Sequence, residues 1–303
     1  MIDARDLRVS FRRGRFGRAK LHALDGFSLA VAAGEVVAIL GPNGCGKSTA
    51  MHTMLGLIQP EDGSVRLMGE RPIPGSAMYD RIAYLPEEPH YHLYLTVGEA
   101  VRYYAGLHRR PVPLKKIAGA IAAVGLEADT DLLLRKCSKG MKQKVGIAAC
   151  LAVEPDLLFL DEPMRGLDPE SVRSFRDELK RMNRGGATIV LNSHILAEVE
   201  MIATRAVIVR KGKVLRQGPI EALRAAQPDR YAVKLALEEQ PPDYLSVSER
   251  RDGAILGTLP AARVRDLFDF VEASGGKVIS AELAKRSLED AFLATLEEGA
   301  GGG

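Results

Sequence analysis

The sequence predicts an α/β fold in which short parallel strands lie buried between helices. Three short apolar runs indicate the strands, over residues 35–40, 157–160 and 187–191. The first run leads directly into a glycine-rich loop and then into an amphipathic segment, residues 49–57, as a buried strand followed by a helix would. A chain of 303 residues suits one large domain and a smaller one.

Residues 1–225 are expected to form the larger domain. Its first 40 residues are typical of short strands, interrupted by the basic run Arg12–Lys20. The simplest interpretation of that run is a solvated hairpin tip, although contact with lipid headgroups or nucleotide phosphates stays open. Beyond the glycine-rich loop and its helix we expect a turn over residues 59–63 and a strand over 64–68.

The middle of this domain is predicted to be helical. Residues from about 90 to 155 have helical periodicity, which Pro111 and Pro113 interrupt. We therefore expect a helical subdomain over about residues 88–155.

A change in pattern near residues 225–229 predicts the start of a small α+β domain over residues 226–298. The tail 299–303 is expected to be disordered because it is almost entirely glycine. Within the small domain we expect strands over 231–237, 253–258 and 277–280, and helices over 261–273 and 287–297.

Composition excludes several functional classes. With 46% hydrophobic and 27% charged residues, the chain is expected to be a soluble globular protein, and its net charge of +3 is too small to predict a nucleic-acid partner. Cys45, Cys137 and Cys150 lack metal-ligand spacing and favour a reducing, cytosolic compartment. The N-terminus lacks the pattern of a signal peptide, and the longest apolar stretch, residues 145–160, is too short to cross a bilayer. Any action at a membrane is therefore expected to go through a partner.

The loop Gly41–Ser48 fits the phosphate-binding pattern G-x-x-x-x-G-K-[ST] at every fixed position. Its glycines allow successive backbone N–H groups to point inward at the start of a helix. Lys47 is expected to reach the β- and γ-phosphates of a nucleoside triphosphate, and the Ser48 hydroxyl to bind Mg²⁺. The alternative is a glycine-rich turn followed by a chance Lys-Ser pair. The nucleotide-binding residues predicted here are Gly41, Asn43, Gly44, Cys45, Gly46, Lys47, Ser48 and Thr49.

A second motif follows the apolar run 157–160. This predicted strand delivers Asp161 to its carboxyl end, where open α/β sheets bind ligands. Asp161 is expected to hold Mg²⁺ through water, and Glu162 to polarise the attacking water. The alternative is a strand that ends in a solvated acidic turn.

A third motif, Cys137-Ser138-Lys139-Gly140-Met141-Lys-Gln, lies about 20 residues before Asp161. Here the chain resembles the ATP-binding cassette (ABC) family, in particular the subgroup that powers ABC-2-type exporters. A Ser hydroxyl and a Gly N–H at a helix start form an anion site. The resemblance implies that Ser138 and Gly140 close over the γ-phosphate held by a second subunit. The alternative is a helix cap, with Ser138 as the N-cap and the following Lys and Gln residues solvated.

Further family positions match this sequence over roughly residues 1–222. Asp168 occupies the place of the D-loop aspartate, which crosses the dimer interface, and His194 that of the histidine that contacts the γ-phosphate. Phe11 matches the aromatic residue that stacks on adenine, although Phe16 is nearby and a core position is the commoner role for Phe. The resemblance implies a P-loop NTPase core of ABC type with an antiparallel β-subdomain and a helical subdomain.

Two positions depart from the family pattern. Glu87 stands where the family commonly has the Gln that senses the γ-phosphate, and exporter-type relatives also carry an acid there. A carboxylate can still bind Mg²⁺ or order water, but it adds negative charge beside the phosphates. Lys139 replaces the first Gly of the signature and Met141 replaces its Gln, which leaves the Ser138 and Gly140 contacts intact.

The resemblance implies an ATP-hydrolysing subunit that forms a homodimer around two ATP molecules and drives a separate transmembrane permease. The protein would then be peripheral, at the cytoplasmic face of the inner membrane. Residues 87–104 are unusually aromatic for a chain with 5% aromatic residues and are the expected docking surface, with local core packing as the alternative. The segment Arg286–Leu293 also resembles the ending of ABC-2 exporter subunits.

Two other functions are alternatives for a chain with a phosphate-binding loop. A soluble ABC ATPase, such as one in iron–sulfur cluster assembly, shares the same motifs. A P-loop kinase or G protein leaves the signature and His194 unexplained. No sequence feature names a transported cargo.

Overall fold

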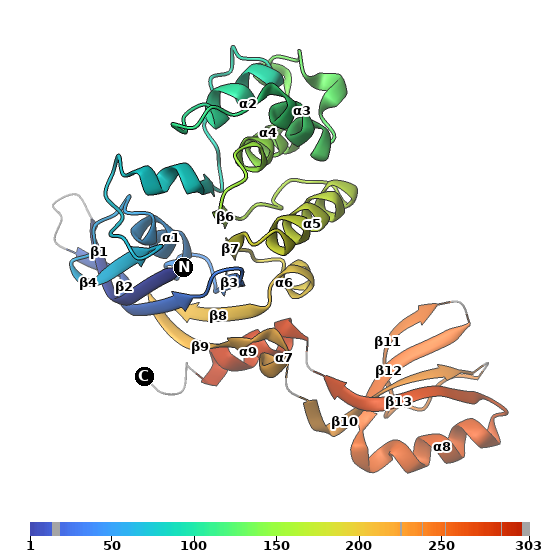
Figure 1. Ribbon diagram of the computed structural model, residues 1–303. Coiled ribbons are helices and arrows are strands. Elements are labelled where there is room, and N and C mark those ends of the chain that lie inside the picture. Colours follow the sequence, from blue (N-terminus) through green and yellow to red (C-terminus); the bar gives the residue numbers. More distant parts are fainter. Residues whose placement is uncertain (14–18, 225, 238, 252, 286, 299–303) are drawn as a thin grey trace. The chain divides into compact units, whose positions relative to one another are not determined.

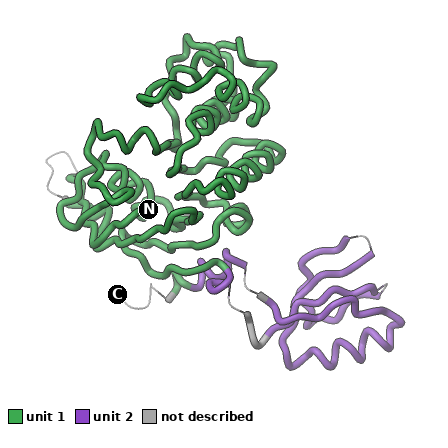
Figure 2. The backbone as a smooth tube through the Cα atoms, viewed as in Figure 1, with its two compact units in different colours: residues 1–220, 295–303 green, residues 221–294 purple. Residues whose placement is uncertain are grey.

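The computed structural model describes residues 1–13, 19–224, 226–237, 239–251, 253–285 and 287–298. The chain divides into two compact units, one formed by Met1–Ile220 with the segment that begins at Thr295, the other by Glu221–Ala294 (Figure 2). The division falls at residue 220, where the sequence analysis placed it after 225. The end of the chain also returns to the first unit.

A six-stranded sheet forms the centre of the first unit (Figure 1). Its order is β5-β6-β7-β3-β8-β9, and every neighbouring pair is parallel except β8 and β9. The strands β3, β6 and β7 are buried along their whole length, as their mainly apolar sequences predict. The predicted α/β class is therefore confirmed. The strands are β3 (Val36–Leu40), β5 (Ile82–Leu85), β6 (Leu157–Asp161), β7 (Thr188–Asn192), β8 (Arg205–Arg210) and β9 (Lys213–Pro219).

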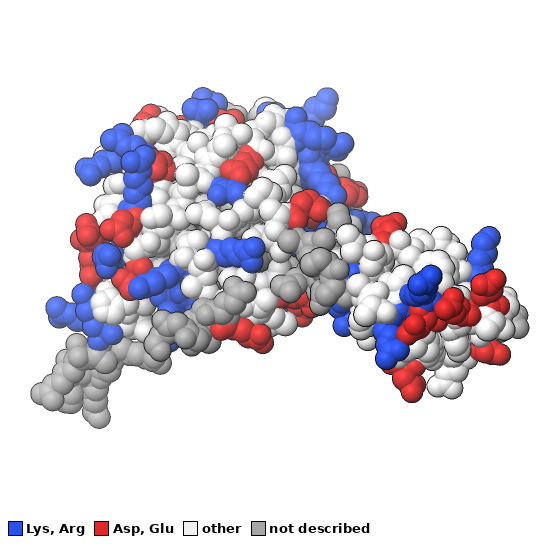
Figure 3. All heavy atoms as spheres, turned by 90° about the horizontal axis from the view of Figure 1, so that it is seen from below, with Lys and Arg blue, Asp and Glu red and all other residues white. Residues whose placement is uncertain are grey.

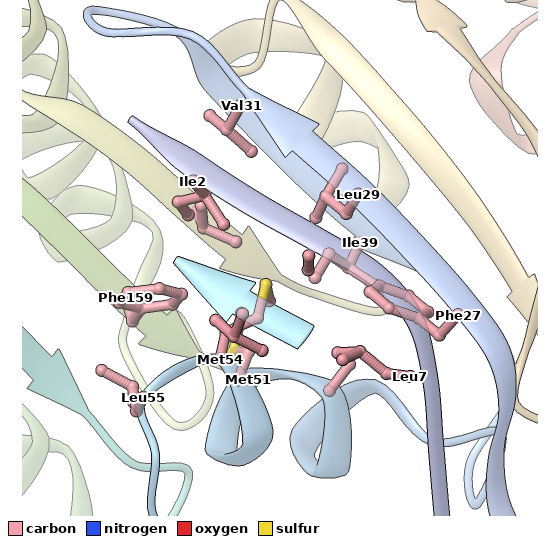
Figure 4. Packing of buried hydrophobic residues seen from close by; sticks show 14 of the residues in the cluster. Ile2, Leu7, Phe27, Leu29, Val31, Ile39, Met51, Met54, Leu55 and Phe159 are labelled. Atoms are coloured by element: carbon pink, nitrogen blue, oxygen red, sulfur yellow. The ribbon is translucent and has the colours of Figure 1, made fainter. Parts of the chain in front are cut away.

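A second, antiparallel sheet packs against the helix that follows the glycine-rich loop. Its order is β2-β1-β4, with β1 Ile2–Arg13, β2 Ala19–Val31 and β4 Asp62–Leu67. β1 and β2 pair out to Arg13 and Ala19, and the predicted tip at residues 14–18, including Phe16, lies outside the described residues. Figure 4 shows side chains of both sheets and of α1 (Lys47–Met54) meeting in one core. The labelled core residues are Ile2, Leu7, Phe27, Leu29, Val31, Ile39, Met51, Met54, Leu55 and Phe159.

Three helices lie between β5 and β6, in the region predicted to be helical. They are α2 (Val97–Ala105), α3 (Leu114–Ala123) and α4 (Lys139–Ala152), joined by irregular segments and single 3₁₀ turns. A capping box starts α2, since the Thr96 hydroxyl accepts from the Glu99 N–H and the Glu99 carboxylate accepts from the Thr96 N–H. The helices α5 (Pro169–Arg184) and α6 (Leu196–Ile202) follow β6 and β7. Among the described residues, no helix is long and apolar enough to cross a membrane.

The second unit contains a four-stranded antiparallel sheet with the order β11-β12-β10-β13. Its core joins Val233 and Leu235 of β10 to Leu267 and Val271 of α8. Sequence analysis missed β11 because all six of its residues, Ser246–Arg251, are exposed and carry no apolar alternation. α7 (Ile220–Leu223) and α9 (Leu288–Glu298) contain the two divisions between the units. The remaining elements are β10 (Ala226–Ala236), β12 (Ala254–Pro260), α8 (Val264–Ala273) and β13 (Lys277–Lys285).

Basic and acidic side chains are interspersed on the face shown in Figure 3. Lys and Arg side chains do not gather there into a single field, which agrees with the small net charge of +3.

Candidate active site

A cavity of about 690 Å³ lies where β3, β6 and β7 end. Parallel strands bring their carboxyl ends to one edge, so residues that follow three separate strands meet there. The lining includes charged groups of both signs and, on one side, residues of β1 and β2. The lining residues are Phe11, Leu21, His22, Ala23, Asn43, Gly44, Gly46, Lys47, Ser48, Thr49, Glu87, Asp161, Glu162, Arg165, Asn192 and His194.

The glycine-rich loop leaves the start of α1 open to the cavity. Gly46 is the N-cap with φ +108°, and no side chain caps the helix. A Cβ at Gly46 would lie 2.3 Å from the Ala23 carbonyl oxygen, so the close approach of β2 also requires glycine there. Because Gly46 and the first residues of α1 line the cavity, the N–H groups of this helix start are available to an anionic ligand.

Lys47 is buried and donates from Nζ to the carbonyl oxygens of Gly41 (2.7 Å) and Pro42 (3.3 Å). Gly41 and Cys45 belong to the loop but do not line the cavity, unlike the other predicted loop residues. A Cβ at Gly41 would lie 2.4 Å from Cys45 Sγ, and burial raises the pKa of the Cys45 thiol.

Asp161 ends β6 inside the cavity. It is only 2% exposed, and its Oδ1 makes no hydrogen bond to any residue that the structure describes. A buried carboxylate oxygen without a partner is costly unless a ligand binds it. The Ser48 hydroxyl lines the same cavity, so these two oxygens fit a Mg²⁺ ion whose remaining ligands come from phosphate and water. The described residues contain no cluster of three His, Cys, Asp or Glu side chains that could hold a metal without such help.

Glu162 is held in an unusual conformation beside Asp161. Its φ of +48° lies in the left-handed region, which is uncommon for residues other than glycine. The Glu162 N–H donates to Asn192 Oδ1 (2.8 Å) and to the Asn192 carbonyl oxygen (3.2 Å). The Glu162 Oε2 lies 2.7 Å from His194 Nδ1 and also accepts from the His194 N–H at 3.3 Å. The structure thus brings Glu162 and His194 together.

Asn192 is a site residue that sequence analysis missed. It pairs with Asp161 across β6 and β7, so its place at the end of a buried strand two residues before His194 was an available signal. The structure adds Arg165 and His22 to the lining as well.

Phe11 and Glu87 lie at the cavity. Phe11 is 43% exposed and is therefore no core residue, although its stacking on adenine stays a prediction. The Glu87 carboxylate forms an ion pair with the Arg165 guanidinium.

The signature residues Ser138 and Gly140 and the D-loop residue Asp168 are absent from the lining of this cavity. Ser138 is the N-cap of α4 and accepts from the Met141 N–H at 3.1 Å. Asp168 is the N-cap of α5, and hydrogen bonds from Ser171 lower the pKa of Asp168 to about 2.

Part of the helix-cap alternative is thus confirmed, but one part is wrong. Gln143 is not solvated, because it is 4% exposed and donates from Nε2 to the Pro163 carbonyl oxygen at 3.1 Å.

The aromatic segment after Glu87 is partly exposed. Tyr94 is 71% exposed, and Leu93 and Tyr103 are also exposed. Tyr91 instead packs inward, with its ring 5.3 Å from that of Tyr104, and its buried hydroxyl finds no partner among the described residues. The core-packing alternative therefore holds for Tyr91.

Known proteins resemble this chain in sequence and in fold. Residues 24–165 match the family described as ABC transporter. The chain is 36% identical over 307 residues to an uncharacterized ABC transporter ATP-binding protein of Nostoc, with 97% of this chain and 89% of that protein covered. It is 30% identical over 283 residues to the bacitracin transport ATP-binding protein BcrA of Bacillus licheniformis, with 89% and 91% covered.

Among solved structures, the ATP-binding subunit of an ABC transporter is 30% identical, with a TM-score of 0.66 over 74% of this chain and 92% of that one. A dimeric ATP-binding cassette bound to ADP and Pi has a TM-score of 0.67 at 23% identity, over 72% and 98% of the two chains, and supports the fold alone.

Proposed function

The chain belongs to the ABC transporter family of ATP-binding proteins and is an ATPase, and we propose that it drives a separate transmembrane permease that exports a solute. The observation that carries this proposal is the cavity at the carboxyl edge of the sheet, where Lys47, the unpartnered Asp161 Oδ1 and the Glu162–His194 pair meet. A further relative, a fluoroquinolones export ATP-binding protein of Mycobacterium tuberculosis, is 34% identical over 214 residues, with 69% of each chain covered. Its name and that of the bacitracin transport protein favour export over a soluble role.

The geometry supports a division of labour within the site. Lys47 and the N–H groups at the start of α1 bind the triphosphate, and Phe11 covers the adenine. Ser48 and Asp161, with Glu87, would hold Mg²⁺, which supplies positive charge to the β- and γ-phosphates when bound.

Glu162 accepts the proton of the attacking water. His194 holds the Glu162 Oε2 through Nδ1 and its backbone N–H, so the carboxylate is fixed before the water arrives. The other ring nitrogen of His194, Nε2, is expected to lie near the γ-phosphate.

Glu162→Gln tests the base assignment. Phosphate release should fall about 100-fold or more, because a positioned base contributes that order of rate, while ATP binding persists. The exposed Glu127→Gln should leave the rate unchanged. Hydrolysis by Glu162→Gln at the wild-type rate would refute the assignment.

Two copies of the chain are proposed to share two ATP molecules. Ser138, Gly140 and Asp168 do not line the cavity of their own chain, so their proposed contacts with nucleotide require a second copy. One solved cassette of the same fold is itself dimeric.

Mixing two inactive variants tests the shared sites. A dimer of Lys47→Ala with Ser138→Arg contains one site with both motifs intact. With equal amounts and random pairing, about half of the dimers are mixed, so the mixture should regain up to about a quarter of the wild-type rate, whereas each variant alone stays inactive. A mixture as inactive as its components would contradict shared sites.

The permease is proposed to dock on the exposed residues Leu93, Tyr94 and Tyr103, which would hold the protein at the cytoplasmic face of the membrane. Tyr94→Glu should weaken co-purification with the permease about tenfold or more, because a charge would enter an apolar interface. Ile73→Glu, at another exposed apolar residue, serves as the control. Unchanged capture by Tyr94→Glu would contradict docking here.

A further inference from the structure

Glu87 and Arg165 form an ion pair on the wall of the cavity. Glu87 follows β5, and Arg165 lies in the loop between β6 and α5. Their side chains are 42% and 43% exposed, so water reaches both of them. Both also line the space that the nucleotide is proposed to occupy.

The cavity carries an excess of negative charge. Among the described residues that line it, three are carboxylates (Glu87, Asp161 and Glu162) and two are permanent cations (Lys47 and Arg165). The ligand proposed for this cavity is a polyanion. Without Arg165, a single permanent cation would face three carboxylates and the triphosphate.

The next residue along the chain provides a contrast. Glu88 pairs with Lys139 at 3.1 Å, both side chains are mostly exposed, and neither lines the cavity. The two consecutive acids therefore have different surroundings. Of these two acids, only Glu87 lies beside the proposed nucleotide.

We propose that Arg165 is a positioning residue of the ATP site, whose guanidinium neutralises Glu87 and so allows a carboxylate to stand beside the triphosphate. This inference rests on the proposed function. A guanidinium suits the task because it stays charged and binds carboxylates through a planar fork of donors. Glu87 then keeps its capacity to bind Mg²⁺ or water, and its charge no longer opposes nucleotide binding.

Titration of the full chain with Mg²⁺ and a non-hydrolysable ATP analogue tests the inference. Arg165→Gln should weaken binding about tenfold, or about 1.4 kcal/mol, a modest figure because water screens the pair. Adding Glu87→Gln to Arg165→Gln should restore the affinity to within about threefold of wild type, since the uncompensated charge is then gone. Arg165→Lys keeps the charge and should also bind within about threefold of wild type.

Arg81→Gln is the matched control. Arg81 pairs with Asp156 at nearly the same exposure, 48% and 49%, but outside the cavity. Its affinity for the analogue should equal that of wild type. A merely structural ion pair would leave Arg165→Gln close to this control.

The inference is overturned if Arg165→Gln binds like wild type, or if Glu87→Gln fails to restore its affinity. Absence of binding by the wild-type chain would overturn the proposed function and this inference with it. Binding by wild type without rescue overturns the inference alone.

Discussion

Two helix starts in this protein carry anion-binding motifs, and they are built differently. At α1 the N-cap is Gly46, which has no side chain to cap the helix, and the first turn opens into a cavity. At α4 the N-cap is Ser138, whose hydroxyl already accepts from the Met141 N–H, and the residue lies outside that cavity. The first helix start therefore has uncapped N–H groups that face a cavity of the same chain. The second is already capped by its own side chain.

A buried amide side chain also forms a hydrogen bond near each of the two sites, Asn192 at the cavity and Gln143 in α4. Asn192 accepts from the Glu162 N–H and so supports the acid beside the cavity. Gln143 donates to the Pro163 carbonyl oxygen and so joins the signature helix to the loop after β6. α4 is therefore connected to the loop after β6 although no residue of α4 lines the cavity.

The largest expected difference between the two helix starts comes from removing Lys47 at α1 or the Ser138 hydroxyl at α4. Lys47→Ala should weaken ATP binding by the isolated chain about 100-fold, because a buried charge-assisted hydrogen bond to phosphate is lost. Ser138→Ala should change it less than about twofold while hydrolysis falls. Calorimetry in dilute solution measures the binding. Equal losses in the two variants would remove the distinction.

Asn192→Ala tests the support of Glu162. The free energy of unfolding should fall by about 1 kcal/mol, since the Glu162 N–H loses the shorter of its two hydrogen bonds and keeps only that to the Asn192 carbonyl oxygen, and ATP turnover should fall as well. Thr188→Val on the same strand removes the acceptor of the Gly34 N–H far from the cavity. It should lower stability in denaturant titrations but leave turnover intact. Wild-type turnover in Asn192→Ala would show that Glu162 needs no such support.

Gln143→Met tests the equivalent amide on the other side. The loss of one buried hydrogen bond should lower the free energy of unfolding by about 1 kcal/mol. ATP binding by the isolated chain should not change, because Gln143 does not line the cavity. A large loss of ATP affinity in this variant would mean that the two sides are not separate.

The smallest expected effect is a change in the alkylation rates of the cysteine thiols. Burial raises the pKa of Cys45 within the glycine-rich loop and of Cys137 beside Ser138. Because less thiolate forms at a given pH, both should be alkylated slowly at pH 8 and faster as the pH rises. In dilute solution ATP should slow the alkylation of Cys45 but not of Cys137, which mass spectrometry can follow. Cys150, whose pKa burial raises to about 12, is the unreactive reference.

The sequence by itself determined the features that depend on short stretches of chain. Three short, mainly apolar runs became buried strands, and the loop Gly41–Ser48 could be identified because its backbone needs glycine at particular positions. Asp161 could be placed because a parallel strand carries its last residue to the ligand-binding edge of the sheet. The roles of these residues stay predictions.

Only the tertiary structure decided which distant residues meet. Glu87 and Arg165 are 78 positions apart, and Glu162 and Asn192 are 30 apart, so no local pattern joins either pair. The helix-cap alternative predicted a solvated Gln143. The structure differs because the Pro163 carbonyl that Gln143 contacts belongs to a loop that only folding brings near. Glu87 thus looked like unbalanced negative charge in the sequence. Its compensating cation became visible only because folding places the ends of β5 and β6 side by side.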